Sequence, residues 1–167
     1  MFRKLDDFFH AYKTLTAGTG RILDALTDES LSVSAAEGHR GLGAMAWHIV
    51  ATVPEMMSRT GLPLSAVDPQ AMPPADASEI VGAYRRVCDE LVAALRADWD
   101  DKTLETVDNL YGEDWPRGVT LQILIHHEIH HRGQITALMR KAGLVVPGIY
   151  GPAKEEWAAH GCDEPPY

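Results

Sequence analysis

Residues 119–141 read VTLQILIHHEIHHRGQITALMRK, and this stretch predicts a long helix. Its aliphatic residues recur mostly at helical spacing, and they are Leu121, Leu124, Ile125, Ile135 and Leu138. Gly143 follows the last turn, where a glycine commonly ends a helix in the left-handed conformation. We therefore expect a helix over 119–141 that buries one face in a bundle.

Four of the eight histidines lie within six residues of this helix, at His126, His127, His130 and His131. They form two pairs at i, i+4, and both rings of such a pair can reach one cation. At about 100° per residue, His127 and His131 lie roughly 50–90° from the centre of the aliphatic face, whereas His126 and His130 lie roughly 160–180° from it. The first pair is expected to face the bundle and the second to face solvent.

A transition metal needs more than two histidines, so a further ligand is expected from another helix. Taken alone, His48 reads as a core histidine bonded to a carbonyl oxygen. It lies, however, at the edge of the apolar side of a predicted helix, and inward side chains on facing helices build the metal sites of bundles. The pair at 127 and 131 therefore favours His48 as the third ligand. The remaining histidines, expected at the surface, are His10, His39 and His160.

Residues 127–131 also match H-E-x-x-H, the zinc-peptidase pattern in which Glu128 would be the general base. Glu155 or Glu156 would then be the third ligand. Such peptidases hold their substrate on a strand beside the cleft, and no clear strand precedes this helix. The peptidase is therefore the less favoured alternative.

Three further stretches show helical periodicity, namely Phe2 to about Leu26, Leu42 to Arg59, and a third that begins after Asp76 and has Ile80 to Leu95 in its apolar stripe. Asp76-Ala77-Ser78-Glu79 has the spacing of a capping box. Pro54 is expected to kink the second helix or to end it early. Thr103–Val107 is a candidate short strand, and Gly151-Pro152 is expected to open a short helix through His160.

Four substantial helices, with no convincing sheet and no internal repeat, predict an all-α four-helix bundle with a short C-terminal helix. The proline-rich connection 62–75 allows a crossover between the second and third helices. No linker divides the chain, so residues 1–167 are expected to form one domain.

The composition excludes several classes of protein. Fifteen basic residues against 24 acidic ones give a net charge of −9, which argues against nucleic acid or an anionic membrane as a partner. No apolar run is long enough to cross a bilayer, and the acidic start is unlike a secretory signal, so a cytoplasmic protein is expected. Cys88 and Cys162 form no CxxC pattern, and Cys88 beside an apolar stripe is expected in the core.

Three segments together resemble the DinB/YfiT-like family of four-helix-bundle metalloproteins: the run His127 to Ile135, the tripeptide Trp47-His48-Ile49 and the tail Pro147 to Pro152. The resemblance covers nearly the whole chain, and HxxxHRGQI is its most specific element. It implies an up-down-down-up bundle, often a homodimer, with one divalent metal, commonly zinc or nickel, on His48, His127 and His131. The departures from the family pattern are Pro54, the doubled histidines and Glu128.

The resemblance also implies a function, because characterised relatives include thiol-dependent S-transferases and a thiol-dependent isomerase. The leading hypothesis is a metal-dependent enzyme, a transferase or a hydrolase, that activates a low-molecular-weight thiol or water for a small-molecule substrate. Gln134 or Glu128 could orient a ligand, and the sequence identifies no catalytic acid or base. The alternative is a non-catalytic dimeric bundle, related to stress, that uses its metal as a structural clip or as a sensor.

Overall fold

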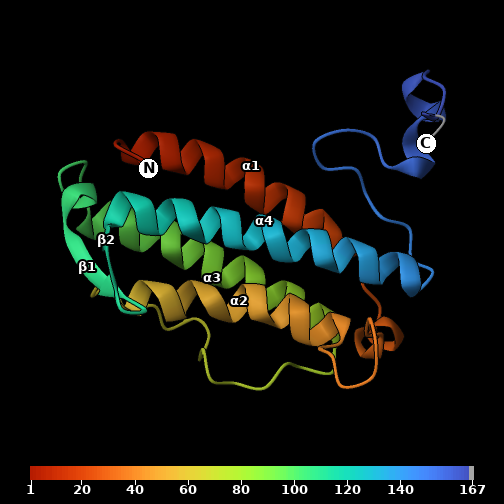
Figure 1. Ribbon diagram of the computed structural model, residues 1–167, viewed down its shortest axis with the longest axis horizontal. Coiled ribbons are helices and arrows are strands. Elements are labelled where there is room, and N and C mark those ends of the chain that lie inside the picture. The colour runs from red at the N-terminus through yellow and green to blue at the C-terminus, as the bar shows by residue number, and fades with distance from the viewer. Residues whose placement is uncertain (166–167) are drawn as a thin grey trace.

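Four helices form the body of the protein in the computed structural model, which describes residues 1–165. They are α1 (Leu5–Asp24), α2 (Leu42–Ser58), α3 (Ala77–Asp98) and α4 (Arg117–Lys141). α1 and α4 run in one direction and α2 and α3 in the other, and the connection after α2 returns along the bundle before α3 begins (Figure 1). The predicted all-α bundle with an up-down-down-up crossover is confirmed.

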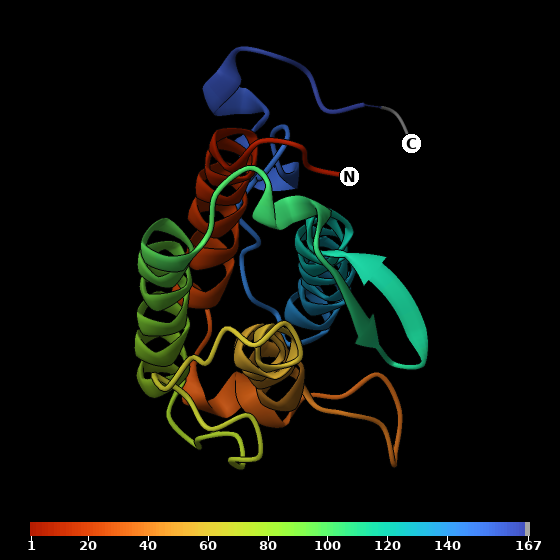
Figure 2. The same ribbon diagram turned by 90° about the vertical axis from the view of Figure 1, so that its left-hand side faces the viewer.

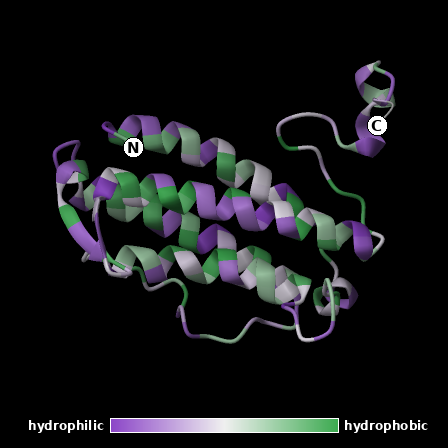
Figure 3. Ribbon diagram, in the orientation of Figure 1, coloured by the Kyte–Doolittle hydropathy of each residue, from purple (hydrophilic) through white to green (hydrophobic). Residues whose placement is uncertain are grey.

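The helices stand at the corners of a square, so each packs on two others (Figure 2). α1 and α2 occupy opposite corners, and both pack on α3 and on α4. The buried side chains of the core are hydrophobic, whereas the middle of the α4 ribbon is coloured as hydrophilic (Figure 3). The fully buried side chains include Phe8, Tyr12, Ile49, Tyr84 and Leu91. The pairing of α2 with α4 matters most for the site, because it brings His48 to the histidine-rich part of α4.

Pro54 was expected to kink α2 or to end it early, and the second alternative was wrong, because α2 continues to Ser58. A proline in a helix lacks the N–H that would bond to the carbonyl four residues earlier. The residues around it, Val53, Met56 and Met57, are all buried. Burial of this apolar face compensates for the missing hydrogen bond and keeps the helix intact.

A two-stranded antiparallel hairpin precedes α4, formed by β1 (Val107–Leu110) and β2 (Glu113–Pro116). The expected strand over 103–107 was wrong in its position. Residues Thr103–Glu105 form a 3-10 turn, because Asp100 Oδ1 accepts hydrogen bonds from the backbone N–H and hydroxyl of Thr103.

The hairpin turn contains two residues, Tyr111 and Gly112, whose φ angles are +57° and +89°. A turn with two positive φ angles favours Asn-Gly or Gly-Gly. Tyr111 is the one non-glycine residue with positive φ among residues 1–165. The left-handed conformation costs such a residue about 1–2 kcal/mol. Contacts of the Tyr111 side chain must therefore offset this cost.

The other helix ends largely follow the sequence. Asp76 accepts hydrogen bonds from the N–H groups of Ser78 and Glu79 at the start of α3, and Gly143 has φ +76° just beyond α4. The short C-terminal helix is instead two 3-10 turns, Lys154–Glu156 and Ala158–His160, and a further 3-10 helix spans Asp28–Ser32. The Glu156 carboxylate accepts from the N–H groups of Gly148 and Ala153, which holds the tail in a turn. No helix in the described part of the chain is long and apolar enough to span a membrane.

Candidate metal centre

His48 on α2 meets His127 and His131 on α4, and the latter two are the pair that the helical angles placed toward the bundle. One ring nitrogen from each lies within 4.8 Å of the other two. The ring centroids are 4.3 Å apart for His127 and His131, 4.6 Å for His48 and His131, and 5.0 Å for His48 and His127. All three residues are half-buried. The bundle thus gathers three imidazoles from two facing helices at one point.

The spacing of the nitrogens fits a small metal ion. The Nε2 atoms of His127 and His131 are 3.1 Å apart. Two ligand nitrogens at about 2.05 Å from a tetrahedral zinc would be separated by roughly 3.3 Å. The two imidazoles of α4 therefore already lie near the separation that a shared ion requires, and His48 is close enough to join them by a small side-chain adjustment.

Gln134 fixes the tautomer of His131. Its Oε1 lies 2.7 Å from His131 Nδ1, and because an amide oxygen can only accept, that nitrogen carries the proton. The Nε2 of His131 is then unprotonated and faces the other histidines. Gln134 Nε2 lies 3.2 Å from His130 Nε2, which helps to hold the amide in this orientation. Hydrogen bonds of this kind orient metal-binding histidines in proteins.

The surroundings favour the neutral, metal-binding form of these rings. Burial, together with the neighbouring His131 and His48, lowers the pKa of His127 to about 4. Burial also lowers the pKa of His48 and of His131. Each ring loses hydration that a charged imidazolium would need, and each adds to the repulsion felt by the others.

A cavity of about 400 Å³ opens beside His48 and His127. Its volume is in the range of small-molecule sites. Glu55 and Tyr111 also line it, and its remaining lining is largely apolar: Ala51, Thr52, Met56, Pro69 and Ile123. A molecule in this cavity would have direct access to the histidine cluster.

The other predicted surface histidines are exposed, and they are His10, His39, His126, His130 and His160. The carboxylates proposed for a peptidase are engaged elsewhere. Glu155 pairs with Arg140, and Glu156 binds the backbone of the tail. His48 therefore occupies the place in the cluster that the peptidase hypothesis gave to an acidic residue.

Glu128 points away from the histidines, into the bundle. It is 2% exposed, and its Oε1 accepts a 2.6 Å hydrogen bond from the hydroxyl of Tyr84 on α3. Its Oε2 is buried without a partner, and burial raises the pKa of Glu128. Arg132, one turn later and 4% exposed, donates to Leu15 O and Thr19 Oγ1 on α1. Glu128 is thus part of a buried polar network rather than a base beside the cluster.

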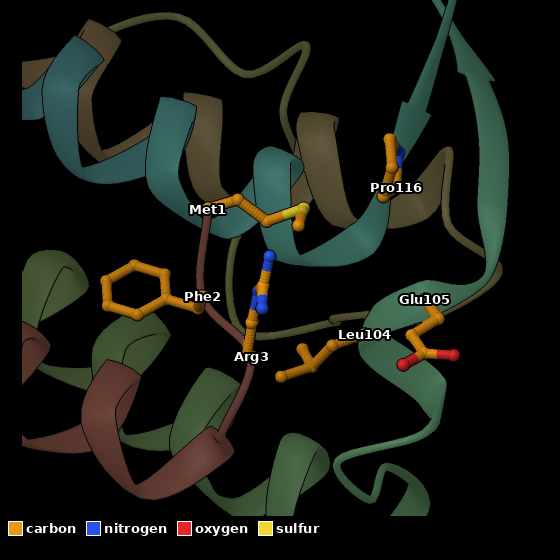
Figure 4. Close-up of a pocket in the computed structure, with 6 residues that line it drawn as sticks. All are labelled: Met1, Phe2, Arg3, Leu104, Glu105 and Pro116. Atoms are coloured by element: carbon orange, nitrogen blue, oxygen red, sulfur yellow. The ribbon is translucent and has the colours of Figure 1, made fainter.

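A separate cavity of about 300 Å³ lies at the end of the bundle where the chain begins (Figure 4). Its lining combines the N-terminal residues Met1, Phe2 and Arg3 with Leu104, Glu105 and Pro116 (Figure 4). Arg3 and Glu105 supply its charge, and neither takes part in the histidine cluster. This cavity carries no arrangement that suggests chemistry.

Sequence reasoning missed Glu55 and Tyr111 as residues of the histidine cavity. Glu55 lies two turns after His48, on the same side of α2, so helical spacing could have suggested it. Tyr111 comes to the cavity through the hairpin, and the sequence held no direct signal of that approach. The one available clue was a tyrosine before a glycine between two short strands.

Comparisons with known proteins agree with the fold. Residues 1–165 match the family model described as the DinB family. The chain is 42% identical over 165 residues to the Bacillus subtilis (strain 168) protein named "Uncharacterized protein YrdA", with 99% of each chain covered. A solved DinB-like protein from Bacillus cereus ATCC 10987 is 43% identical, with a TM-score of 0.86 over 90% of this chain and 100% of that one.

A second solved structure is more distant. The DinB-like protein YjoA from Bacillus subtilis is 18% identical, with a TM-score of 0.68 over 88% of this chain and 99% of that one, and this likeness shows the fold alone. The family model spans nearly the whole chain, and the first two relatives exceed 40% identity. This chain therefore belongs to the DinB family.

Proposed function

We propose that the protein binds one divalent metal ion through His48, His127 and His131 and uses it to activate a small thiol for transfer to an electrophilic substrate. One observation carries the proposal: three half-buried imidazole nitrogens lie within 4.8 Å of one another beside an open cavity. Imidazole ligands suit both zinc and nickel. The metal would be one of these two ions.

The histidines, Gln134 and the cavity lining would each have a distinct role in this reaction. The three neutral imidazoles bind the ion without reducing its charge, and Gln134 keeps the Nε2 of His131 free for that purpose. A dication in this place supplies Lewis acidity, which lowers the pKa of a thiol or water that binds beside it. The largely apolar lining of the cavity gives a substrate an apolar surface to pack against.

The proposed transfer balances without a further reactant. The thiol loses its proton to solvent, and its sulfur forms a bond to an electrophilic carbon. The leaving group departs from that carbon with the bonding electron pair. The thiolate is the nucleophilic form of the sulfur, so a lowered thiol pKa at neutral pH is the property that the site must supply.

Cobalt substitution tests this proposal. We expect the cobalt-loaded protein to show a sulfur-to-cobalt charge-transfer band when a small thiol is added, and the His131→Ala protein to lack it. Turnover of a haloarene with the same thiol would then establish the transfer. His126→Ala is the matched control, because His126 is an exposed histidine on the same helix, and it should retain both the band and the turnover.

The result also separates catalysis from a structural use of the metal. The apolar helix faces fill the core without any metal, so we expect the metal-free protein to stay largely helical. A metal-free form that unfolds, together with a cobalt form that responds to no thiol, would refute the enzyme and support the structural clip.

A further inference from the structure

The end of the histidine cavity formed by Glu55 and Tyr111 is an ordered polar cluster. The Tyr111 hydroxyl donates a 2.5 Å hydrogen bond to Glu55 Oε2. Arg59 donates to Glu55 Oε1 at 2.7 Å, and its guanidinium lies 4.5 Å from the centre of the Tyr111 ring. Glu55 and Tyr111 both line the cavity that His48 and His127 also line. The cavity therefore has two polar regions, one at the histidines and one at this Glu55–Tyr111 pair.

The hairpin that carries Tyr111 is fixed to α2 at its base. Arg117 binds Asp108 of β1 through two hydrogen bonds and donates at 2.6 Å to Thr60 O, just beyond the end of α2. The hairpin accordingly descends alongside the start of α4 toward α2 (Figures 1 and 2). Tyr111 is thus held over Glu55 by its own contacts and by the anchored strands.

Backbone strain at Tyr111 is a second, independent indication that this residue has a binding role. Its φ of +57° is unfavourable for a tyrosine, and glycine or asparagine would fit this turn better. Residues held in sparsely populated conformations cluster at ligand-binding and active sites. The tyrosine ring at the turn places a hydroxyl in the cavity lining, which neither of the favoured residues would do.

The hydrogen bonds of this cluster determine what it can recognise. The Tyr111 hydroxyl has one proton, and that proton is given to Glu55. Both the tyrosine oxygen and the carboxylate oxygens keep lone pairs, so toward the cavity the pair can only accept. A ligand group at this end must therefore donate a hydrogen bond, because a carboxylate there would meet only acceptor atoms of the pair.

We propose that the Glu55–Tyr111 pair is a specificity subsite for a small molecule that carries a metal-binding head, a short apolar middle and a hydrogen-bond donor at its far end. The donor is a hydroxyl, an amide N–H or an ammonium group, and the apolar middle lies against Ala51, Met56 and Ile123. This inference rests on the proposed metal site, because the head of the ligand is placed by the histidines.

The test uses cobalt-loaded protein and straight-chain thiols that differ only in their end group: ammonium, hydroxyl, methyl or carboxylate. Several chain lengths are titrated, and the cobalt spectrum gives each dissociation constant. At the best length we expect the ammonium and hydroxyl thiols to bind about tenfold more tightly than the methyl thiol, as one net charge-assisted hydrogen bond would give. The carboxylate thiol should bind more weakly than the methyl thiol.

Two variants assign the effect to the pair. Tyr111→Phe keeps the ring over Arg59 and removes the hydroxyl, whereas Glu55→Met removes the charge. Both should reduce the preference for donor end groups over the methyl end group to about threefold or less, while cobalt content stays at the wild-type level. If only one of the two variants loses the preference for donor end groups, the residue changed in that variant is the acceptor. Tyr150→Phe is the matched control, because Tyr150 is 70% exposed and does not line the cavity, and it should behave as the wild type does.

Failure of the subsite is distinguishable from failure of the proposed function. Equal affinity for all end groups, or a preference that survives both variants, would overturn the subsite alone. If thiols give no spectral response, hydroxamates with the same end groups are titrated instead, so that thiol activation fails while the subsite is still tested. A protein that takes up no cobalt would overturn both.

Discussion

Two faces of α4 carry residue pairs of the same spacing and use them in opposite ways. On the face toward α2, His127 and His131 are half-buried beside a cavity. On the face toward α1 and α3, Glu128 and Arg132 are almost fully buried in a network with Tyr84 and Thr19. The first pair is open to an incoming ligand, and the second is closed by protein contacts. Spacing along a helix therefore sets which residues act together, and the packing around them decides between binding and stability.

The largest expected effect comes from disrupting the closed face. Arg132→Met keeps the length of the side chain but removes the donor to Leu15 O and Thr19 Oγ1, and it leaves Glu128 without a nearby cation. We expect the free energy of unfolding to fall by about 3 kcal/mol. Urea denaturation of the metal-free protein measures this, and metal content of the folded variant should stay at one ion per chain.

His130→Met is the control for that variant, because it changes an exposed position on the same helix. Its stability should lie within about 0.5 kcal/mol of the wild type. Equal, small effects for the two variants would show that the buried network does not stabilise the fold, and the contrast between the two faces would be lost.

A smaller effect is expected from acid on the open face of the metal-free protein. The pKa of His127 is lowered to about 4 in the folded chain, chiefly by burial, whereas an unfolded histidine has a pKa of about 6.5. Between these values the unfolded state binds a proton that the folded state does not. This contribution to stability is therefore complete above about pH 6.5 and is lost as the pH falls toward 4.

His127→Asn removes that titration. Because the ring is only half-buried, we expect stability to fall with acid less steeply in the variant, by about 0.5 kcal/mol per pH unit. Denaturation series between pH 7 and pH 4.5 compare the two proteins. Parallel curves would mean that the His127 ring is protonated equally easily in the folded and unfolded chains.

The smallest expected effect is on the third, solvent-facing side of α4. Gly133 is exposed within the helix, and a Cβ there would meet nothing within 4 Å. Gly133→Ala should therefore stabilise the protein by about 0.5 kcal/mol, because alanine loses less backbone freedom on folding. Thermal unfolding measures the gain, and metal content should not change. A loss of stability or of metal would mean that Gly133 contributes to the buried Glu128–Arg132 network or to the histidine cluster.

The sequence predicted the bundle and the inward-facing histidine pair because both follow from the periodicity within single helices. The angle between His127 and the aliphatic face needs no knowledge of other segments, and the structure places this ring toward α2 as expected. Glu128 and Arg132 lie in the same aliphatic stripe as Leu124 and Ile135, so their burial could also have been anticipated.

Contacts between distant segments could not be predicted in this way. Tyr111 reaches Glu55 across 56 positions, and Tyr84 reaches Glu128 across 44. Both contacts depend on how the elements pack, and the first depends also on a hairpin whose turn adopts an unfavourable conformation for tyrosine. The same applies to the C-terminal tail, where the Glu156 side chain binds the backbone and favours turns over the expected helix.

Metal content of a set of single variants tests the central claim most directly. Each protein is loaded with zinc, freed of excess ion and measured by elemental analysis. We predict about one zinc per chain for the wild type, His126→Ala and His130→Ala, and almost none for His48→Ala, His127→Ala and His131→Ala. Full zinc content in the His48→Ala protein would contradict the account, because the metal would then not be shared between α2 and α4.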